Sequence, residues 1–257
     1  MYRRVVIKIG SAVLTEQNRL ARDRIFDIVK LIAELKSSGI EVIIVSSGAV
    51  SAGYTRLKLD KKSLANRQAL ASIGQSIMMT AYQKKFDLFD IKVAQILLIE
   101  EDFRSSDHIH NAKSTIDVLL KNGVVPIINE NDTVAIDELR FGDNDQLSAH
   151  STYHFGANLL VILSDIDGYY TANPREDKSA TIRRHIEDIT ESELSQDVTP
   201  NSPFATGGIV TKLKAGKYLI DRGLNMFLSS GFKLENVESL LLKGSYRKGS
   251  LFGKIDG

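Results

Sequence analysis

One short segment in the middle of the chain concentrates the residue types that bind small charged ligands. Between Asn129 and Asp145 the sequence holds six acidic residues and one arginine, directly after the apolar run Val124–Ile128. Like charges repel one another, and burying a charge is costly unless it is paired. Acids and amides packed this densely beside a core strand predict a ligand, and an amine, a carboxylate partner or Mg²⁺ would each fit.

Two lysines stand beside glycine-rich turns elsewhere in the chain. Lys8 precedes Gly10 at the end of an apolar run, and Lys212 ends the stretch Thr206–Lys212, which opens a predicted helix. Backbone N–H groups, a helix dipole and a lysine can hold a phosphate. Neither motif has Walker spacing, and each alone would also suit a solvated lysine or a loop capped by Thr206. Combined with the acids, they describe phosphoryl transfer, in which cations neutralise the moving group.

Other kinds of catalysis fit the sequence less well. The segment around Ser47 lacks the Gly-x-Ser-x-Gly pattern of hydrolases, so we expect the Ser47 hydroxyl and nearby backbone N–H groups to hold a carboxylate. Cysteine is absent, which excludes disulfides and thiolate nucleophiles. Two histidine pairs have no suitable third metal ligand nearby and are expected at the surface. They are His108 with His110 and His150 with His154.

The composition is that of an ordinary globular protein with a sizeable core. The chain has 257 residues, of which 43% are hydrophobic and 25% charged. A net charge of +1 gives no reason to expect nucleic acid or a membrane surface as a partner. No apolar run approaches the ~18 residues that span a bilayer, and Lys8 interrupts the N-terminal one. We therefore expect a cytoplasmic protein that binds neither nucleic acid nor membrane.

The elements that must position these residues alternate between apolar strands and amphipathic helices. We expect strands at Val5–Ile9, Ile40–Val45, Val93–Ile99, Val124–Ile128, Leu159–Leu163, Leu224–Ser229 and Val237–Leu242, and helices at Arg22–Ser38, Ala65–Phe86, Ile109–Lys121 and Val210–Asp221. The polar region Arg175–Gln196 is expected to form loops, a short strand and a helix. This alternation predicts an α/β fold with a mostly parallel sheet covered on both faces.

Four polar or glycine-rich turns follow the predicted strands. They are Gly10-Ser11, Ser46–Gly48, Asn129–Asp132 and Ser164-Asp165. Because ligands of such sheets gather at the carboxyl ends of the strands, these turns predict one shared site in place of four independent loops.

The motifs resemble those of the amino acid kinase family, in the family's order and over nearly the whole chain. The matching stretches are Val6–Ser11, Val45–Ala49, Gln68–Gln75, Pro126–Ala135, Phe141–Ala149, Ser164–Pro174 and Thr206–Lys212. The pair Ile128–Asp132 and Gly142–Asp145 is the most specific. In the loop Phe204–Ile209, which begins just before the last stretch, Ala205 and Ile209 differ slightly from the usual family residues, and we expect the turn to keep its conformation.

The resemblance implies a three-layer αβα sandwich in which residues 1–257 form one kinase domain. Its part at about 1–155 would carry the acid substrate, and its part at about 156–257 would carry ATP. Many relatives append a PUA domain, and we expect none here, because the chain ends at Gly257 shortly after the matched region. We also expect a homo-oligomer.

The implied reaction is the ATP- and Mg²⁺-dependent phosphorylation of the γ-carboxylate of L-glutamate, which feeds proline biosynthesis. Lys8 and Lys212 would stabilise the transferring phosphoryl group, and Asp145 would hold these lysines in register. The substrate residues would be Ser47, Gly48, Asn129, Asp132, Asp143 and Asn144, with Asp132 pairing the ammonium. The ATP residues would be Lys8, Gly10, Ser164, Asp165, Thr206, Gly207, Gly208, Ile209, Val210, Thr211 and Lys212. The sequence does not single out the acid that would hold Mg²⁺.

Two other functions remain open at the level of the sequence. One is phosphorylation of another small acid by the same fold, and the other is a silent regulator that binds a nucleotide or an amino acid. The presence of Lys8, Asp145 and Lys212 together argues against the silent regulator. The family further implies feedback inhibition by proline at or overlapping the glutamate pocket. Thr133–Phe141 would be a loop or hairpin closing over the substrate.

Overall fold

The computed structural model describes residues 2–135, 144–172, 174, 176–195 and 208–254, in which strands and helices alternate. The strands are β1 Arg4–Ile9, β2 Thr15–Glu16, β3 Arg19–Leu20, β4 Glu41–Val45, β5 Val93–Leu98, β6 Val125–Glu130, β7 Leu159–Ser164, β8 His185–Ile186, β9 Asn225–Ser230 and β10 Ser250–Phe252. The helices are α1 Ser11–Leu14, α2 Arg22–Ser37, α3 Ala49–Tyr54, α4 Leu64–Phe86, α5 Ser106–Lys121, α7 Asp145–His154, α8 Glu191–Leu194, α9 Gly208–Ile220 and α10 Glu235–Lys243, with 3₁₀ turns η1 Asp87–Phe89 and η2 Glu100–Arg104. Within these described ranges, no helix combines the length and the apolar character needed to cross a membrane.

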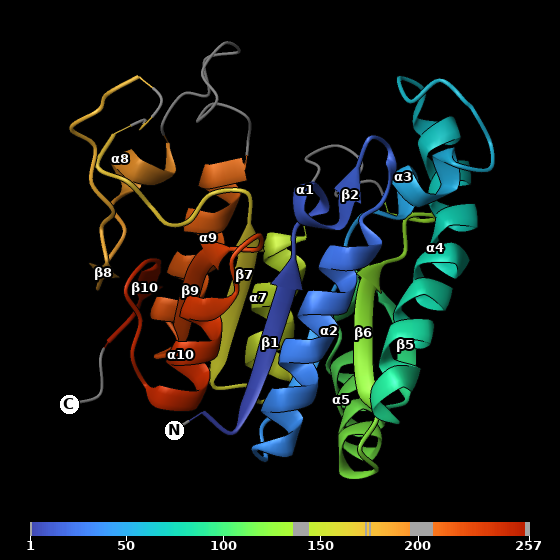
Figure 1. The fold of residues 1–257 in the computed structure, drawn as a ribbon, viewed down its shortest axis with the longest axis horizontal. Coiled ribbons are helices and arrows are strands. Elements are labelled where there is room, and N and C mark those ends of the chain that lie inside the picture. Colours follow the sequence, from blue (N-terminus) through green and yellow to red (C-terminus); the bar gives the residue numbers. More distant parts are fainter. Residues whose placement is uncertain (1, 136–143, 173, 175, 196–207, 255–257) are drawn as a thin grey trace.

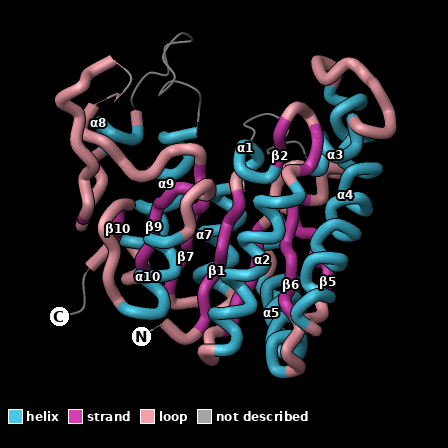
Figure 2. The backbone as a smooth tube through the Cα atoms, in the orientation of Figure 1, coloured by secondary structure: helices cyan, strands magenta, loops and turns pink. Residues whose placement is uncertain are grey.

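One central sheet organises the molecule, and helices cover both of its faces (Figures 1 and 2). Its strand order is β5-β6-β4-β1-β7-β9-β10-β8. Among the described strands of this sheet, neighbours run parallel except for the antiparallel pair β9–β10. A separate two-stranded hairpin joins β2 to β3. The mostly parallel, three-layer α/β sandwich predicted from the sequence is therefore confirmed.

Alternation along β1 distributes its side chains between the two layers of helices. Val5, Ile7 and Ile9 belong to one core cluster, together with buried residues of α2, α4 and α10. Val6 belongs to the other cluster, with residues of α5, α7 and α9. Successive side chains of a strand point to opposite faces, so Lys8 shares the face of Val6. The fold thus directs this lysine toward α7 and α9.

The last predicted strand, Val237–Leu242, is wrong, because these residues lie in helix α10. Val237, Leu240 and Leu241 are buried at helical spacing and pack against the sheet. The final strand is instead β10, which pairs with β9 and escaped prediction. The other predicted strands and helices are confirmed, with ends that differ by a few residues, and β8 and α8 fall within the predicted region Arg175–Gln196.

The expectation of surface histidines is also wrong for one residue. His150 is half-buried on α7, where its ring stacks on Phe103 at 5.1 Å and lies 4.4 Å from the Tyr218 ring. Burial, together with the nearby His154, Arg222 and Arg104, lowers the pKa of His150 to about 4. His150 is therefore a neutral packing residue between α7, α9 and η2.

Helices α3 and α4 cross so closely that two positions must be glycine. A Cβ atom added to Gly53 would lie 1.9 Å from the Leu70 carbonyl oxygen, and one added to Gly74 would lie 1.7 Å from the Ala49 carbonyl oxygen. No side chain fits at such distances, so the crossing requires glycine at both places. The contact fixes the start of α3, beside Gly48, against the middle of α4.

Candidate functional site

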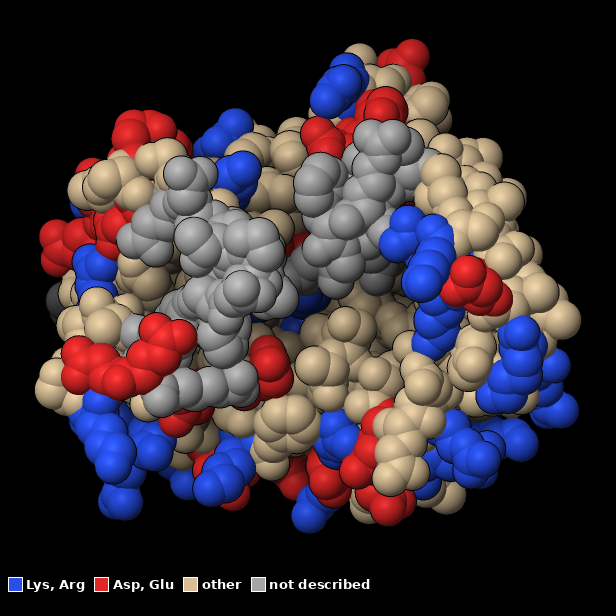
Figure 3. Space-filling view, turned by 90° about the horizontal axis from the view of Figure 1, so that it is seen from above, with Lys and Arg blue, Asp and Glu red and all other residues tan. Residues whose placement is uncertain are grey.

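The turns predicted to share one edge of the sheet do so. The register of β1 pairs Lys8 with Val45 on one side and Ile9 with Leu163 on the other. The Gly10 N–H donates to the Leu163 carbonyl at 3.0 Å, and the Ser46 N–H donates to the Ile128 carbonyl at 2.9 Å. Figure 3 looks onto this edge, where basic and acidic side chains are interspersed. The strand ends therefore deliver their polar residues to a common surface.

A buried carboxylate bridges two buried lysines at the centre of this edge. Lys8 Nζ lies 2.8 Å from Asp145 Oδ1, and Lys212 Nζ lies 3.1 Å from Asp145 Oδ2. The Thr211 hydroxyl also donates to Asp145 Oδ2, at 2.9 Å. The three charged residues come from different elements: Lys8 from β1, Asp145 from the first position of α7, and Lys212 from the second turn of α9. We call Lys8, Asp145 and Lys212 the lysine centre.

The lysine centre carries two positive charges and one negative charge, and its three side chains are almost completely buried. Breaking up such a group is costly, because the remaining charges would be left without compensation in the interior. The Lys212 ammonium also donates to the Gly208 carbonyl at 3.0 Å, which ties it to the first turn of α9. A preorganised excess of positive charge suits an anion such as a phosphoryl group.

Beside the lysine centre, amide groups connect three of the predicted substrate residues. Asn144 Nδ2 donates to the Ser46 carbonyl at 2.8 Å, to Asn129 Oδ1 at 2.9 Å and to the Ser47 hydroxyl at 3.4 Å. Asn144 immediately precedes Asp145 in the chain, so the amide cluster and the lysine centre are covalent neighbours. Gly48, with φ of +97°, lies between Ser47 and α3, in a conformation that favours glycine. The structure thus brings Ser47, Gly48, Asn129 and Asn144 together.

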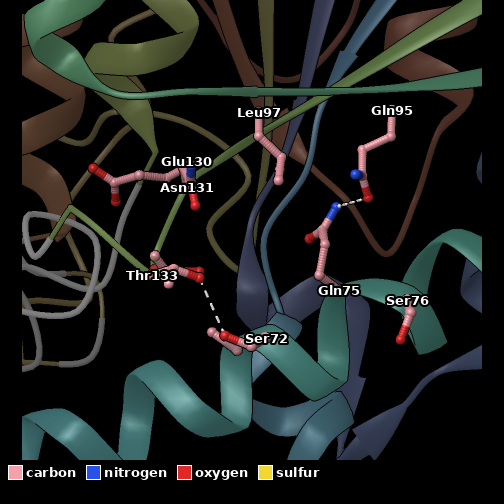
Figure 4. A pocket seen from close by; sticks show the side chains of 10 residues that line it. Ser72, Gln75, Ser76, Gln95, Leu97, Glu130, Asn131 and Thr133 are labelled. Carbon is pink, nitrogen blue, oxygen red and sulfur yellow. Dashed lines mark hydrogen bonds between the residues drawn. The ribbon is translucent and has the colours of Figure 1, made fainter.

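Two acids border a pocket of about 280 Å³ on the outer side of this cluster. Glu130 and Asp132 are only 7% and 6% exposed. Burial, together with the negative charge of Glu130, raises the pKa of Asp132 to about 7. Asp132 Oδ1 is buried without a hydrogen-bond partner among the described residues. The pocket lies between α4 and the ends of β5 and β6 (Figure 4), and its two acids suit a cationic group. We call it the acidic pocket.

The predicted ATP residues lie along the remaining part of the edge. Ser164 ends β7, and its hydroxyl donates to Asp165 Oδ1 at 3.1 Å. A Cβ atom on Gly10 would lie 3.2 Å from the Leu163 carbonyl oxygen, so glycine leaves room beside Lys8. Gly208, Ile209, Val210, Thr211 and Lys212 form the first turns of α9. Asp143, Thr206 and Gly207 lie outside the described residues, as does most of the predicted loop Thr133–Phe141.

Sequence reasoning missed three residues of the site, namely Gln75, Gln95 and Glu130. Gln75 accepts a hydrogen bond from Asn129 Nδ2 at 2.9 Å and donates one to Gln95 Oε1 at 2.9 Å. Glu130 borders the acidic pocket beside Asp132. Glu130 was visible as part of the acidic segment, whereas Gln75 was marked only by the stretch that matched the family. No group of three or more potential metal ligands occurs among the residues that the structure describes.

A model of the amino acid kinase family matches residues 3–230, so the chain belongs to this family. A protein of Wolinella succinogenes is 53% identical over 97% of both chains, and one of Leishmania donovani is 50% identical over 97% of this chain and 95% of its own. Both of these relatives are named glutamate 5-kinase.

Solved structures support the fold at much lower identity. Isopentenyl phosphate kinase of T. acidophilum superposes with a TM-score of 0.64 at 14% identity, covering 96% of this chain and 99% of its own. UMP kinase of Bacillus anthracis superposes with a TM-score of 0.62 at 17% identity, covering 97% and 95%. These matches extend the shared architecture to kinases of different substrates.

Proposed function

We propose that this enzyme transfers the γ-phosphoryl group of ATP to the γ-carboxylate of L-glutamate, giving L-glutamyl 5-phosphate, in the first step of proline biosynthesis. The observation that carries the proposal is the lysine centre next to a pocket with two buried acids. The first suits a phosphoryl group, and the second suits the ammonium of an amino acid. The relatives named glutamate 5-kinase favour this substrate over other small acids.

The site can orient glutamate by matching each of its charges. Asp132, with an unpartnered buried oxygen among the described residues, would pair with the ammonium group. The Ser47 hydroxyl and the backbone N–H groups near Gly48 would hold carboxylate oxygens. Asn144 and Asn129 would complete the polar wall between the acidic pocket and the lysine centre. The γ-carboxylate would then face the phosphoryl group held by the lysines.

The reaction needs charge neutralisation and alignment more than proton transfer. The attacking carboxylate is already ionised at pH 7, so no general base is required. As the new bond from its oxygen to phosphorus forms, the bond between phosphorus and the ADP oxygen breaks, and Lys8 and Lys212 would stabilise the negative charge on the transferring group. Asp145 would keep both ammonium groups in place throughout.

ATP and Mg²⁺ fit the residues of the strand edge. The first turns of α9 and the glycine beside Lys8 leave backbone N–H groups and two cations for the phosphates. Mg²⁺ usually binds through phosphate oxygens, waters and one or two carboxylates, and it would supply further charge neutralisation. Ser164 and Asp165 would lie on the nucleotide side.

The proposal extends to the whole chain. Residues of about 1–155 would bind glutamate, and residues of about 156–257 would bind ATP. Proline, which shares the amino acid backbone charges of glutamate, would inhibit by competing for the acidic pocket. The protein would act in the cytoplasm, where ATP and glutamate are supplied, and as a homo-oligomer.

The test is a coupled assay of ADP release with a panel of acids, ATP and Mg²⁺. L-Glutamate should be the preferred acceptor, and adding proline should lower its rate. Turnover of aspartate or N-acetylglutamate without turnover of glutamate would identify another small-acid kinase. Binding of ATP and glutamate by calorimetry with no turnover would identify a silent regulator.

A further inference from the structure

Four side-chain amides form a continuous chain from the edge of the sheet to the substrate side. Gln95 lies on the edge strand β5, Gln75 on α4, Asn129 on β6, and Asn144 just before α7. Each successive pair is joined by a hydrogen bond of 2.9 Å. Figure 4 shows the outermost link, between Gln75 and Gln95, on the wall of the acidic pocket.

The hydrogen bonds of this chain all run in one direction. Asn144 donates to Asn129, Asn129 donates to Gln75, and Gln75 donates to Gln95. An amide has one donor side and one acceptor side, so the orientation of each group fixes that of the next. Because Gln75 presents its oxygen to Asn129, Asn129 must present its own oxygen to Asn144. Asn144 must in turn direct its NH₂ group toward Asn129, Ser46 and Ser47.

Gln75 is well placed to support this direction at the outer end, as the Ser46 carbonyl does at the inner end, because its backbone adjoins a tight helix crossing. The preceding residue, Gly74, lies in the close crossing of α3 and α4, where the Ala49 carbonyl leaves no room for a side chain. On the other side, the Gln75 amide is held by Gln95. Gln75 therefore presents an acceptor to Asn129 from a fixed position.

We infer that Gln75, supported by Gln95, is a positioning residue that orients the amides of Asn129 and Asn144 for the acid substrate. It acts through these two asparagines and not on the reacting atoms. The inference deepens the proposed function, since it rests on glutamate binding beside Asn129 and Asn144. A glutamine on the wall of the acidic pocket would thereby affect kcat/KM for glutamate without touching the reacting atoms.

Two substitutions of similar size separate orientation from simple filling of space. Q75E keeps an acceptor facing Asn129, whereas Q75M removes both hydrogen-bonding groups. Orientation predicts that Q75M lowers kcat/KM for glutamate by roughly tenfold, the effect of one lost hydrogen bond, while Q75E stays within about threefold of wild type. A space-filling role predicts the opposite order, because Q75E places a charge near two acids. The KM for ATP should change by less than about twofold in both variants.

The matched control is Q83M, two turns further along α4, where the Gln83 side chain donates a hydrogen bond to Asp87, away from the amide chain. It should leave kcat/KM for glutamate unchanged. Thermal unfolding of all variants checks that the losses in rate are not losses of folded protein. A loss of less than about twofold in Q75M, or a larger loss in Q75E than in Q75M, would overturn the inference.

A double-mutant cycle tests whether Gln75 acts through Asn129. In an N129A background, Q75M should cost less than about twofold, because the link is already broken. An undiminished cost in that background would contradict the inference. If wild type phosphorylates a different acid, the proposed substrate is wrong, and the same cycle run with that acid still decides whether Gln75 positions the amides.

Discussion

The lysine centre and the acidic pocket differ in how their charges are compensated. In the lysine centre, one carboxylate contacts two ammonium groups, so protein groups compensate one another. In the acidic pocket, Asp132 lies beside a second acid, and its pKa rises to about 7 because of burial and the charge of Glu130. Among the described residues, the lysine centre is held together by its own ion pairs, whereas Asp132 Oδ1 in the acidic pocket has no hydrogen-bond partner.

This difference separates two tasks that a kinase must perform. Charge that is already paired and fixed can act on the transition state without rearranging. Charge that is left uncompensated favours the ligand that compensates it, and so contributes to binding and selectivity. Damage to the lysine centre should therefore lower kcat and stability, whereas damage to the acidic pocket should raise the KM for glutamate.

The largest effect is expected from D145N. Removing the charge leaves two buried lysines repelling each other, so kcat should fall by roughly 10³-fold or more and the free energy of unfolding by about 3 kcal/mol. Steady-state kinetics and urea unfolding measure the two effects. The control is D221N, which changes an exposed residue directly after α9 and should alter neither kcat nor the free energy of unfolding. A D145N protein with normal stability would contradict the view that the lysine centre depends on its internal ion pairs.

K212A should lower kcat by roughly 10²- to 10³-fold, because one cation no longer stabilises the transferring phosphoryl group. The KM for glutamate should change little, since the acidic pocket remains intact. Lys214, exposed on the same helix, offers the matched control K214A, which should behave as wild type. A rise in the KM for glutamate alone would contradict a role in phosphoryl transfer.

D132N should raise the KM for glutamate by roughly 10- to 100-fold, the effect of losing a charge-assisted hydrogen bond, with little change in the KM for ATP. It should also stabilise the ligand-free protein at pH 8, because it removes a charge that burial and the neighbouring Glu130 disfavour. The surface variant D60N is the control. Equal loss of affinity for glutamate and ATP would argue against an ammonium-binding role.

The smallest expected effect is a pH dependence that belongs to the acidic pocket. Because the pKa of Asp132 is raised to about 7, its carboxyl is neutral below that pH, and ammonium binding requires the ionised form. The KM for glutamate should therefore rise by up to about tenfold per pH unit below pH 7, and glutamate binding should release protons. D132N should abolish both effects, which pH-dependent kinetics and calorimetry in two buffers would measure.

The raised pKa of Asp132 also affects stability, and here the effect of pH is opposite: glutamate binding improves as pH rises, whereas stability decreases. Between about pH 4 and pH 7 the folded protein holds a proton on Asp132 that the unfolded chain has lost. The contribution of Asp132 to the free energy of unfolding therefore falls as pH rises through this range. The D132N protein should lack this contribution in unfolding experiments.

The architecture was predictable where one pattern dominated each segment. The apolar runs that became β1, β4, β6 and β7 are bounded by polar turns, and their parallel order follows from the helices between them. The prediction failed for α10, because the run Val237–Leu242 is short and rich in apolar residues, and only packing against the sheet decides its conformation. The strand β10 has three residues and too little pattern to detect.

The site was predictable to the extent that its residues follow strands or carry charge. Lys8, Asp132 and Asp145 stand out because burying them needs a reason. Gln75 does not, since a glutamine on a helix has no distinctive pattern, and its contact with Asn129 joins residues 54 positions apart. The crossing of α3 and α4, which requires glycine at both Gly53 and Gly74, fixes the part of α4 that carries Gln75.

That crossing also bears on how the substrate range of this enzyme could be changed. Apart from Gln75, the side chains of α4 that border the acidic pocket are small, namely Ala71, Ser72 and Ser76. We expect enlarged side chains here to leave α4 in place, because the close contact of Gly74 with Ala49 fixes its backbone against α3. Added volume would therefore go into the pocket itself. The fixed position of α4 therefore limits the length of the acid that fits, and its three small residues are the positions at which substitutions would change that limit.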